Sequence, residues 1–365
     1  MPNLFDPLPL AGITLPNRVI LSPMCQYSAE DGVPNDWHLQ HLARYGAAGL
    51  GLIVTEATHV SAEGRITPGC LGLWNEAQAA AFARIIRAIR AMSDTPVGVQ
   101  IAHAGRKASA EVPWKGGRPL ADERAWQQIA PSPLPHDTGW PLPREMSEFD
   151  IARVKAEFVA SVRLALKAGF DLVELHGAHG YLIHSFLSPV SNQRSDRYGG
   201  SLENRLRFPL ELFEAVREAW PRERALGMRI TGSDYLDGEG WQIGDAVVLA
   251  RALKDRGADF VDVSAGGVAV SRQKMALGPG YQAGLAETVR RETGITTFAV
   301  GMIVDPALAQ SIVAGGRADA VMLGRGLLHD PFWAWRAADA LGAKVSVPGP
   351  YLRGRHLPPE VAASA

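Results

Sequence analysis

The sequence predicts an α/β fold, a single-domain (β/α)8 TIM barrel that comprises residues 1–365. Short runs of β-branched or aliphatic residues alternate with longer amphipathic or alanine-rich stretches, which indicates parallel strands joined by helices. The apolar runs lie at residues 19–21, 52–55, 97–101, 172–175, 226–230, 260–263, 297–300 and 320–323. Eight such strand and helix units are the number that closes this kind of barrel.

The stretches between the runs carry helical patterns and helix-ending signals. Helices are predicted at 77–92, 151–168, 206–219, 245–256, 284–292 and 305–314. Three of them are followed by glycine, at Gly169, Gly257 and 315–316. Glycine adopts the left-handed conformation of a helix C-cap without a steric cost, so each predicts a sharp stop before the next strand.

Two irregular segments stand outside this alternation. Residues 103–150 are rich in proline, glycine and tryptophan and are much longer than the usual connection of about 2–6 residues, so we expect a lid or hairpin excursion. The segment 336–365 contains Pro348, Pro350, Pro358 and Pro359, so we expect an extended tail over a surface.

Composition limits the class of partner. The chain is 47% hydrophobic and 21% charged, with a formal net charge of −1 and no dense block of lysine and arginine. This balance disfavours nucleic acid or an anionic membrane surface. No stretch reaches the about 18 apolar residues of a membrane span, and the N-terminus has no basic flank with an apolar run. We therefore predict a cytoplasmic protein that acts on a small molecule.

Cysteine usage limits the metal chemistry. Cys25 and Cys70 are the two cysteines of the chain, too few for a disulfide framework, a four-thiolate metal site or an iron–sulfur cluster. Both are predicted to be reduced thiols.

Polar residues follow two of the predicted strands. The first strand ends in Ser22-Pro23-Met24-Cys25-Gln26-Tyr27, and the fourth leads into His176, His179 and Tyr181. In a barrel these strand ends form the catalytic rim. Two adjacent imidazoles can donate to a carbonyl or phenolate oxygen, bind a metal, or serve as structural groups. A metal would need further ligands. The His-x-His pattern that metal-dependent barrel hydrolases carry on their first strand is absent, which disfavours a metal site. The Tyr181 hydroxyl could transfer a proton.

Charged residues are also predicted inside the barrel. Glu174 shares side-chain parity with His176, so its carboxylate needs a partner, and Arg229 on the next strand is a candidate. The Arg229 guanidinium could instead lie beside an anion that forms during a reaction.

Small residues end the last three strands. Ser264 begins a turn with two glycines, Gly301 follows strand seven, and Gly324 with Arg325 follows strand eight. This corner of a barrel commonly binds phosphate, and together these turns predict a phosphorylated cofactor. The polar tract 192–205 has an architectural interpretation, in which Ser201 caps the following helix while arginine and aspartate brace the loop that carries the histidines.

These segments resemble the Old Yellow Enzyme family of flavin-dependent ene-reductases across nearly the whole chain, through SPMCQYS, HGAHGYL, NQRSDRYGGSLENRLRF, VGMI and MLGRG. The cysteine in SPMC, the chain length and Tyr351–Gly354 resemble the thermophilic-like subgroup that includes bacterial xenobiotic reductases.

The resemblance implies roles for individual residues. A non-covalently bound FMN would lie along the first-strand segment, contact further positions on strands two, three and five, and place its phosphate at the glycine turns; these positions are Ser22, Pro23, Met24, Cys25, Ala57, Gln100, Arg229, Gly301, Gly324 and Arg325. Cys25 would tune the flavin potential. His176 and His179 would hold the activating oxygen of the substrate, Tyr181 would donate a proton, and Tyr27 would lie over the substrate.

The implied reaction is ping-pong reduction of the activated C=C bond of an α,β-unsaturated carbonyl compound, with NADPH as hydride donor and transfer through flavin N5. Arg353 is a candidate for an arginine that enters a neighbouring subunit's site, which would make the protein a homodimer or homotetramer. The tail sequence departs from other subgroup members, some of which place tryptophan here. Two alternatives are a metal-dependent barrel hydrolase that uses His176 and His179, and a flavin-binding barrel without turnover.

Overall fold

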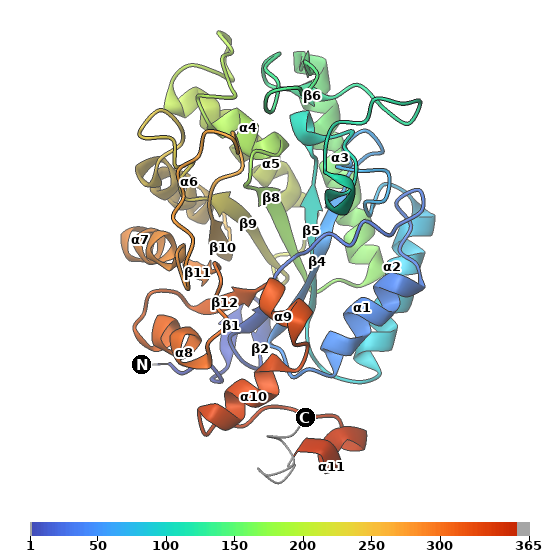
Figure 1. Cartoon of the computed structure of the whole chain (residues 1–365), viewed down its shortest axis with the longest axis vertical. Helices are drawn as coiled ribbons and strands as arrows, with labels where there is room; N and C mark the ends of the chain where they lie inside the picture. Colours follow the sequence, from blue (N-terminus) through green and yellow to red (C-terminus); the bar gives the residue numbers. More distant parts are fainter. Residues whose placement is uncertain (1, 356–365) are drawn as a thin grey trace.

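The computed structural model describes residues 2–355, and within them eight parallel strands close a barrel that is wrapped by helices (Figure 1). The strands follow chain order around the barrel: β3 (Val19–Leu21), β4 (Leu52–His59), β5 (Val97–Ala102), β8 (Leu172–Gly177), β9 (Ala225–Thr231), β10 (Phe260–Ser264), β11 (Thr296–Ala299) and β12 (Ala320–Leu323). Each predicted apolar run is therefore a barrel strand, and the TIM-barrel prediction is confirmed. Within the described residues, no helix has both the length and the apolar character needed to cross a bilayer.

The predicted helices are present with slightly shifted ends. They are α2 (Glu76–Arg90), α3 (Glu148–Ala168), α5 (Leu202–Ala219), α6 (Ile243–Asp255), α7 (Ala283–Thr293) and α8 (Pro306–Ala314). The predicted glycine stops are confirmed, because Gly169, Gly257 and Gly316 have φ of +95°, +83° and +68°. Ser201 caps α5 by accepting a hydrogen bond from the Asn204 backbone N–H, as predicted.

Several elements were not predicted from the sequence. They are the hairpin of β1 (Leu8–Leu10) and β2 (Ile13–Leu15), and the helices α1 (Asp36–Gly46), α4 (Leu182–Leu187), α9 (Arg325–His329) and α10 (Trp333–Ala340). Leu8, Leu10 and Leu15 of the hairpin pack with inward residues of the barrel strands, such as Phe260 and Phe298. The hairpin therefore contributes to the core inside the barrel. Its strands are too short to show the alternating hydrophobic pattern by which a strand is predicted from sequence.

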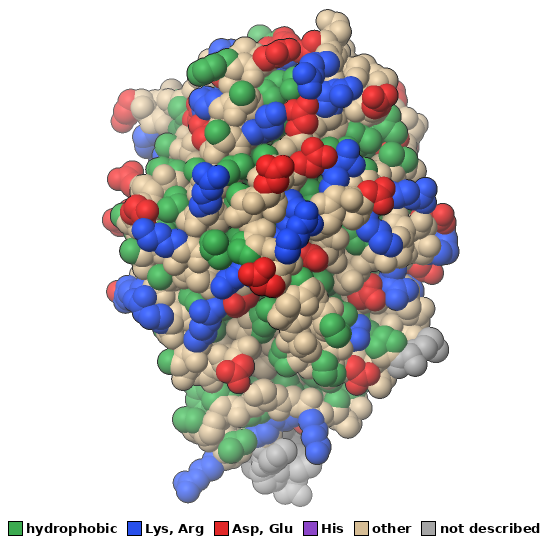
Figure 2. All heavy atoms as spheres, turned by 180° about the vertical axis from the view of Figure 1, so that it is seen from behind, with side chains coloured by type: hydrophobic (Ala, Val, Ile, Leu, Met, Phe, Trp, Pro, Cys, Tyr) green, Lys and Arg blue, Asp and Glu red, His purple; other side chains and the backbone are tan. Residues whose placement is uncertain are grey.

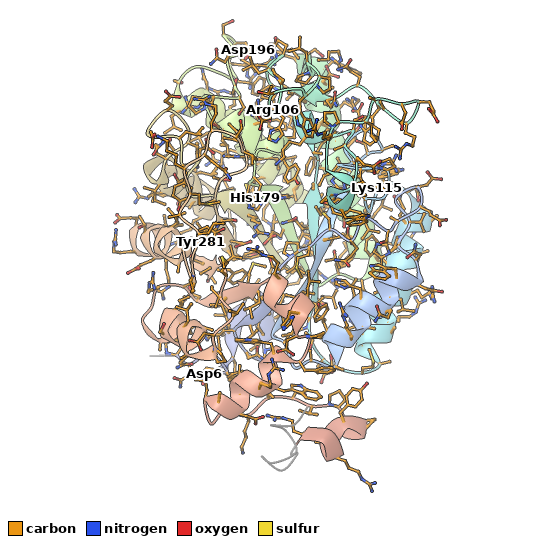
Figure 3. All side chains as sticks on the ribbon, in the orientation of Figure 1. Asp6, Arg106, Lys115, His179, Asp196 and Tyr281 are labelled. Atoms are coloured by element: carbon orange, nitrogen blue, oxygen red, sulfur yellow. The ribbon has the colours of Figure 1, made fainter. Side chains whose placement is uncertain are left out.

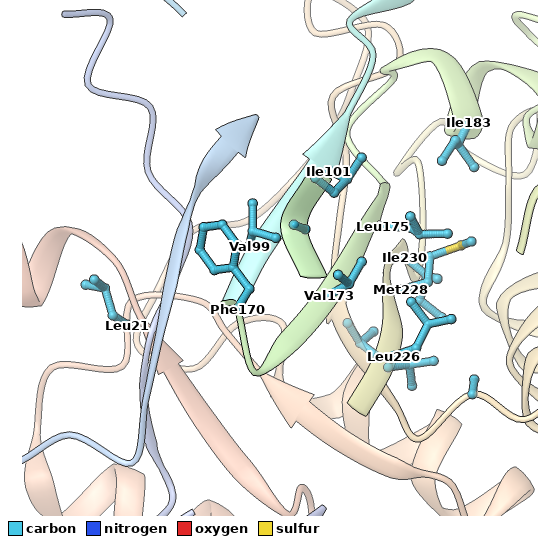
Figure 4. Packing of buried hydrophobic residues seen from close by; sticks show 14 of the residues in the cluster. Leu21, Val99, Ile101, Phe170, Val173, Leu175, Ile183, Leu226, Met228 and Ile230 are labelled. Carbon is cyan, nitrogen blue, oxygen red and sulfur yellow. The ribbon is translucent and has the colours of Figure 1, made fainter. Parts of the chain in front are cut away.

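Strand parity separates the core into an outer and an inner part. Val173 and Leu175 of β8, and Leu226, Met228 and Ile230 of β9, belong to the large cluster that packs against the helices (Figure 4). The alternate residues of the same strands point into the barrel because successive side chains of a strand face opposite sides. Polar residues at these inward positions reach the interior near the carboxyl ends of the strands.

The long segment after β5 is shorter than predicted, because α3 begins at Glu148 with Ser147 as its cap. It contains the 3-10 turns η1 (Gly105–Lys107) and η2 (Pro113–Lys115) and the short strands β6 (Ile129–Ala130) and β7 (Arg144–Glu145). β6 and β7 pair in parallel, so these two strands do not form the predicted hairpin. The Arg194 guanidinium donates to the carbonyl oxygens of Pro131 and Met146, so this arginine braces the long segment after β5 and not the loop that carries the histidines.

The C-terminal segment is only partly extended. α10 continues to Ala340, and residues 349–355 form the turn η3 (Gly349–Tyr351) and the short helix α11 (Leu352–Arg355), so the prediction of extended chain is wrong there. Tyr351 contacts Phe332 and Trp335 edge-on, which holds this turn against the α10 region. Pro358 and Pro359 lie outside the described residues. On the face seen in Figure 2, acidic and basic side chains are interspersed.

Candidate functional site

Inward positions on neighbouring strands bring the central side chains of the site together. His176 of β8 pairs in register with Arg229 of β9, which pairs with Asp262 of β10, while Gln100 of β5 pairs with Glu174 of β8. Side chains in register on adjacent parallel strands are neighbours. The inward polar residues of β5, β8, β9 and β10 therefore form one continuous polar surface. The strand parity inferred from the sequence is thus confirmed at Glu174, His176 and Arg229.

The two predicted histidines lie side by side with the predicted tyrosine. The ring centroids of His176 and His179 are 5.2 Å apart, and those of His176 and Tyr181 are 4.9 Å apart. His179 has a φ of +61°, and its backbone N–H donates to Thr231 Oγ1 at 3.0 Å. Figure 3 shows His179 near the centre of the molecule. This left-handed turn brings His179 and Tyr181 back toward His176.

The hydrogen bonds of the histidines define their proton positions. His176 Nδ1 accepts a hydrogen bond from the Ala178 backbone N–H at 3.4 Å, so the ring proton lies on Nε2. His179 Nε2 lies 2.7 Å from the Ser264 hydroxyl oxygen. Burial and the nearby Arg229 guanidinium hold the pKa of both imidazoles well below the usual range. Both rings are therefore neutral at physiological pH.

Lys107 is a functional candidate that the sequence reasoning missed. Its ammonium lies 4.5 Å from the centroid of the Tyr181 ring and donates to the carbonyl oxygens of His179, at 2.8 Å, and Gly267, at 3.2 Å. Burial and the nearby Arg106 lower the pKa of Lys107 to about 7. The sequence around Lys107 contains no motif that indicates a functional role. Only the folded conformation of this segment places the ammonium beside Tyr181.

Arg229 has a different partner from the one predicted. Its Nε lies 2.8 Å from Asp262 Oδ2, while Glu174 Oε1 accepts a hydrogen bond from Gln100 Nε2 at 2.7 Å. Glu174 and Asp262 are fully buried, and burial raises the pKa of both carboxyls. Asp262 was missed because it lies within an apolar run. Register places it directly beside Arg229, whereas Glu174 pairs in register with Gly227.

The turn after β3 carries the predicted thiol and phenol. Cys25 is partly exposed, and burial together with Cys70 and Glu56 raises its pKa well above the usual value. Tyr27 has a φ of +52° and meets Trp114 edge-on, with ring centroids 5.8 Å apart. Ser22 lies deeper, where its hydroxyl oxygen is 3.4 Å from Arg229 Nη1. Ala57, another predicted contact, is buried on β4.

A cavity of about 650 Å³ opens at the ends of β10, β11 and β12. Its lining includes the predicted residues Arg229, Ser264, Gly301, Gly324 and Arg325, and also His179. Gly301 has a φ of +121°, a conformation that L side chains rarely adopt, so a glycine is needed at this turn. The structure therefore brings the predicted phosphate-binding turns and one of the two histidines to the same cavity. Ser264, grouped with these turns from the sequence, also bonds to His179.

Arg353 is exposed on α11, which lies at the lower edge of the molecule in Figures 1 and 3, away from His179. It forms no contact with the site of its own chain among the described residues.

Metal-ligand geometry is absent from the part of the chain that the structure describes: no group of three or more His, Cys, Asp or Glu side chains is placed to hold an ion. His176 and His179 thus lack the additional ligands that the hydrolase alternative requires.

Comparison with known proteins shows the family of the chain. The profile of the NADH:flavin oxidoreductase / NADH oxidase family matches residues 3–343. The chain is 42% identical over 353 residues to the NADPH dehydrogenase of Geobacillus sp. (strain WCH70), covering 96% of this chain and 98% of that protein. It is 39% identical over 354 residues to the NADPH dehydrogenase of Bacillus subtilis (strain 168), covering 96% and 99%.

Solved structures give the same result for the fold. Morphinone reductase superposes with a TM-score of 0.77 at 30% identity, covering 96% of this chain and 92% of that chain. Its complex with tetrahydroNAD gives 0.76 at 29% identity, covering 99% and 96%. The protein is therefore an FMN-dependent oxidoreductase that uses a nicotinamide hydride donor. With its barrel, its strand-end cavity and these matches taken together, the chain belongs to the NADH:flavin oxidoreductase / NADH oxidase family, among the enzymes of the Old Yellow Enzyme type.

Proposed function

We propose that the protein reduces the activated C=C bond of α,β-unsaturated carbonyl compounds. The supporting observation is that His176, His179 and Tyr181 form one cluster whose His179 lines the strand-end cavity. That cavity has a volume in the range of cofactor sites. Its glycine turns, the Arg229 guanidinium and the Arg325 side chain, for which no ion pair is found among the described residues, fit a phosphorylated and electron-rich cofactor.

In this proposal Arg229 would hold the FMN at its ring, and Gly301, Gly324 and Arg325 would hold its phosphate. The bound cofactor would supply the redox chemistry, which is hydride transfer from NADPH to the β-carbon of the substrate. Ser22, Pro23, Met24, Cys25, Ala57 and Gln100 are the proposed contacts along the ring.

The two histidines act on the carbonyl oxygen of the substrate. His176 carries its proton on Nε2, and no described residue bonds to this nitrogen, so it can donate to an oxygen acceptor. His179 can add a second donor through Nδ1 when Ser264 donates to its Nε2. Because both rings stay neutral, they polarise the carbonyl by hydrogen bonding and do not lose charge as the pH changes.

Tyr181 is the proposed proton donor for the α-carbon, and Tyr27 lies over the substrate. Burial, with contributions from Cys25 and Cys70, raises the pKa of Tyr181, so the phenol is protonated at neutral pH. Its backbone turn is fixed by hydrogen bonds from the Tyr181 N–H to the Ala178 carbonyl and from the Leu182 N–H to the His103 carbonyl. A protonated and positioned phenol can provide general acid catalysis, typically worth about 10²–10⁴-fold in rate.

The test separates the two half-reactions. The FMN-loaded protein is reduced anaerobically with NADPH and then mixed with cyclohexenone, for the native chain and for Tyr181→Phe. We expect both proteins to be reduced by NADPH, while reoxidation by cyclohexenone slows by about 10²-fold or more in the variant. Equal reoxidation rates would remove Tyr181 from the proton-donor role. Absence of reoxidation in the native protein would support a flavin-binding barrel without this activity.

We further propose that the functional unit is a homodimer or homotetramer in which Arg353 completes a neighbouring subunit's substrate site. The exposure of Arg353 and the position of its helix α11 at the lower edge of the molecule (Figure 1) support this arrangement. Arg353→Ala should raise the KM for cyclohexenone without changing the sedimentation coefficient. A monomeric native protein in sedimentation velocity would contradict the proposal.

A further inference from the structure

Glu56 is a buried carboxyl group that neither the sequence reasoning nor the mechanism above employs. It lies within β4, and its side chain is 4% exposed. The pairing of β4 with β5 shifts between Thr55 and Ala57, so Glu56 is the extra residue of a β-bulge. Bulges turn a side chain away from its regular direction and often occur next to active sites.

The Glu56 carboxyl is directed at the turn that carries Cys25 and Tyr27. Glu56 Oε2 accepts a hydrogen bond from the Gln26 backbone N–H at 2.9 Å. The Gln26 side chain closes the same turn, because its Nε2 donates to the Met24 carbonyl at 2.9 Å. Glu56 therefore anchors the turn through Gln26, the residue between Cys25 and Tyr27.

The second oxygen of Glu56 faces the start of α1. Glu56 Oε1 lies 3.6 Å from His38 Nε2. His38 Nδ1 lies 3.2 Å from the Asn35 backbone nitrogen and 3.0 Å from Asn35 Oδ1, so the other edge of the ring faces Glu56. Burial lowers the pKa of His38 to about 4, so this ring is neutral and supplies no countercharge.

No lysine or arginine among the described residues forms an ion pair with Glu56. The titratable groups that face it are Cys25 and Tyr27 from the turn, His38 from α1, and Cys70 from the segment after β4. Burial raises the pKa of Glu56 to about 8. An ionised Glu56 would oppose the ionisation of the neighbouring thiol, since like charges disfavour one another.

We propose that Glu56 is a positioning residue for the Met24–Tyr27 turn, and that its carboxyl, bonded to the amide next to Cys25, opposes formation of a thiolate beside the flavin. The bulge of β4 directs the Glu56 side chain to the turn, and the hydrogen bond from the Gln26 N–H holds the carboxyl next to Cys25. Above about pH 8, where Glu56 is ionised, its charge opposes ionisation of the Cys25 thiol. The residue works through Cys25 and does not itself touch the reacting atoms.

The test follows the Cys25 thiol in the FMN-loaded protein. A thiolate beside oxidised flavin adds a long-wavelength charge-transfer absorbance, so the band is titrated with pH, up to about pH 10. Glu56→Gln retains an oxygen acceptor for the Gln26 N–H but carries no charge. We expect the midpoint of the band to fall by roughly one pH unit, about a tenfold increase in the thiolate fraction.

Three further variants complete the experiment. Cys25→Ala must abolish the band and shift the flavin spectrum, which tests the placement of Cys25 independently of Glu56. Glu56→Asp keeps the charge and should retain the native midpoint. Glu157→Gln changes a carboxyl elsewhere, beside Arg153, and should also titrate as the native protein. A band of equal intensity in the native protein and in Glu56→Gln at every pH of the titration would overturn the proposal, because the charge of Glu56 would then have no effect on the thiol.

Discussion

His179 Nε2 lies 2.7 Å from Ser264 Oγ, which joins the β8 loop to the end of β10. The Ser264 hydroxyl is also 3.4 Å from Gln282 Oε1, so Ser264 has two acceptors for its single proton. The shorter contact decides which nitrogen of His179 carries the ring proton, and hence which edge of the ring can donate to a substrate.

We therefore expect Ser264→Ala to reduce kcat for cyclohexenone by about five- to tenfold, as the loss of one hydrogen bond of ~1 kcal/mol implies. Steady-state kinetics with kcat and KM resolved measures this effect. Ser264→Thr keeps the hydroxyl and should restore most of the rate, whereas equally low rates in both variants would point to packing and not to the hydroxyl.

Lys107 places a partly buried cation 4.5 Å from the centroid of the Tyr181 ring. Its charge should stabilise the negative charge that develops on Tyr181 during proton donation. Because the pKa of Lys107 is lowered to about 7, chiefly by burial, the charge is present below that pH and is lost as pH rises through it.

The reoxidation rate with cyclohexenone should accordingly decline above about pH 7 in the native protein. Lys107→Met should be roughly tenfold slower at pH 6 and should lack this decline, because no charge remains to be lost. Stopped-flow reoxidation across the pH range checks both points, and an identical alkaline decline in the variant would exclude Lys107 as its origin.

Arg229 is the cation that lies between two buried carboxyls, in contact with Asp262 and near Glu174. Arg229→Met leaves these groups without a cation and should lower the free energy of unfolding by about 3–5 kcal/mol. The double variant Arg229→Met/Asp262→Asn should recover part of that loss in urea unfolding. The double variant should still lose FMN on gel filtration, since the cation that we propose beside the flavin is missing. An undiminished urea midpoint in Arg229→Met would contradict the role of this ion pair in stability.

Buried histidines should make the fold sensitive to acid. Eight of the ten histidines have a pKa lowered chiefly by burial: His38, His41, His59, His103, His136, His176, His179 and His184. The unfolded chain binds these protons below about pH 6.5 while the folded chain does not, so stability falls as pH decreases, by ~1.4 kcal/mol per pH unit for each uncompensated proton.

Three buried carboxyls act in the opposite direction. The raised pKa values of Glu56, Glu174 and Asp262 keep protons on the folded chain that the unfolded chain releases, so their effect weakens the fold as pH rises. The histidines outnumber them, and the urea midpoint should fall between about pH 6.5 and 5.5. A midpoint that is constant or rises over this interval would contradict the assignment of neutral, buried imidazoles.

The sequence by itself determined the barrel and the inventory of its rim. Apolar runs of strand length, separated by helical stretches that end at glycines such as Gly169, define parallel pairing because local backbone preferences and burial act in the same direction. The parity of Glu174 and His176 followed from the two-residue period of a strand, and the glycine turns at Gly301 and Gly324 marked the cavity.

Only the tertiary structure decided which of these groups contact one another. Arg229 forms its ion pair with Asp262 and not with Glu174, the partner predicted from the sequence. The register between strands, which closure of the whole barrel sets, decides this pairing. Lys107 reached Tyr181 through an irregular loop, and Glu56 reached Gln26 through a bulge. Neither an irregular loop nor a bulge has a sequence period, so both placements depend on long-range packing that local residue patterns do not encode.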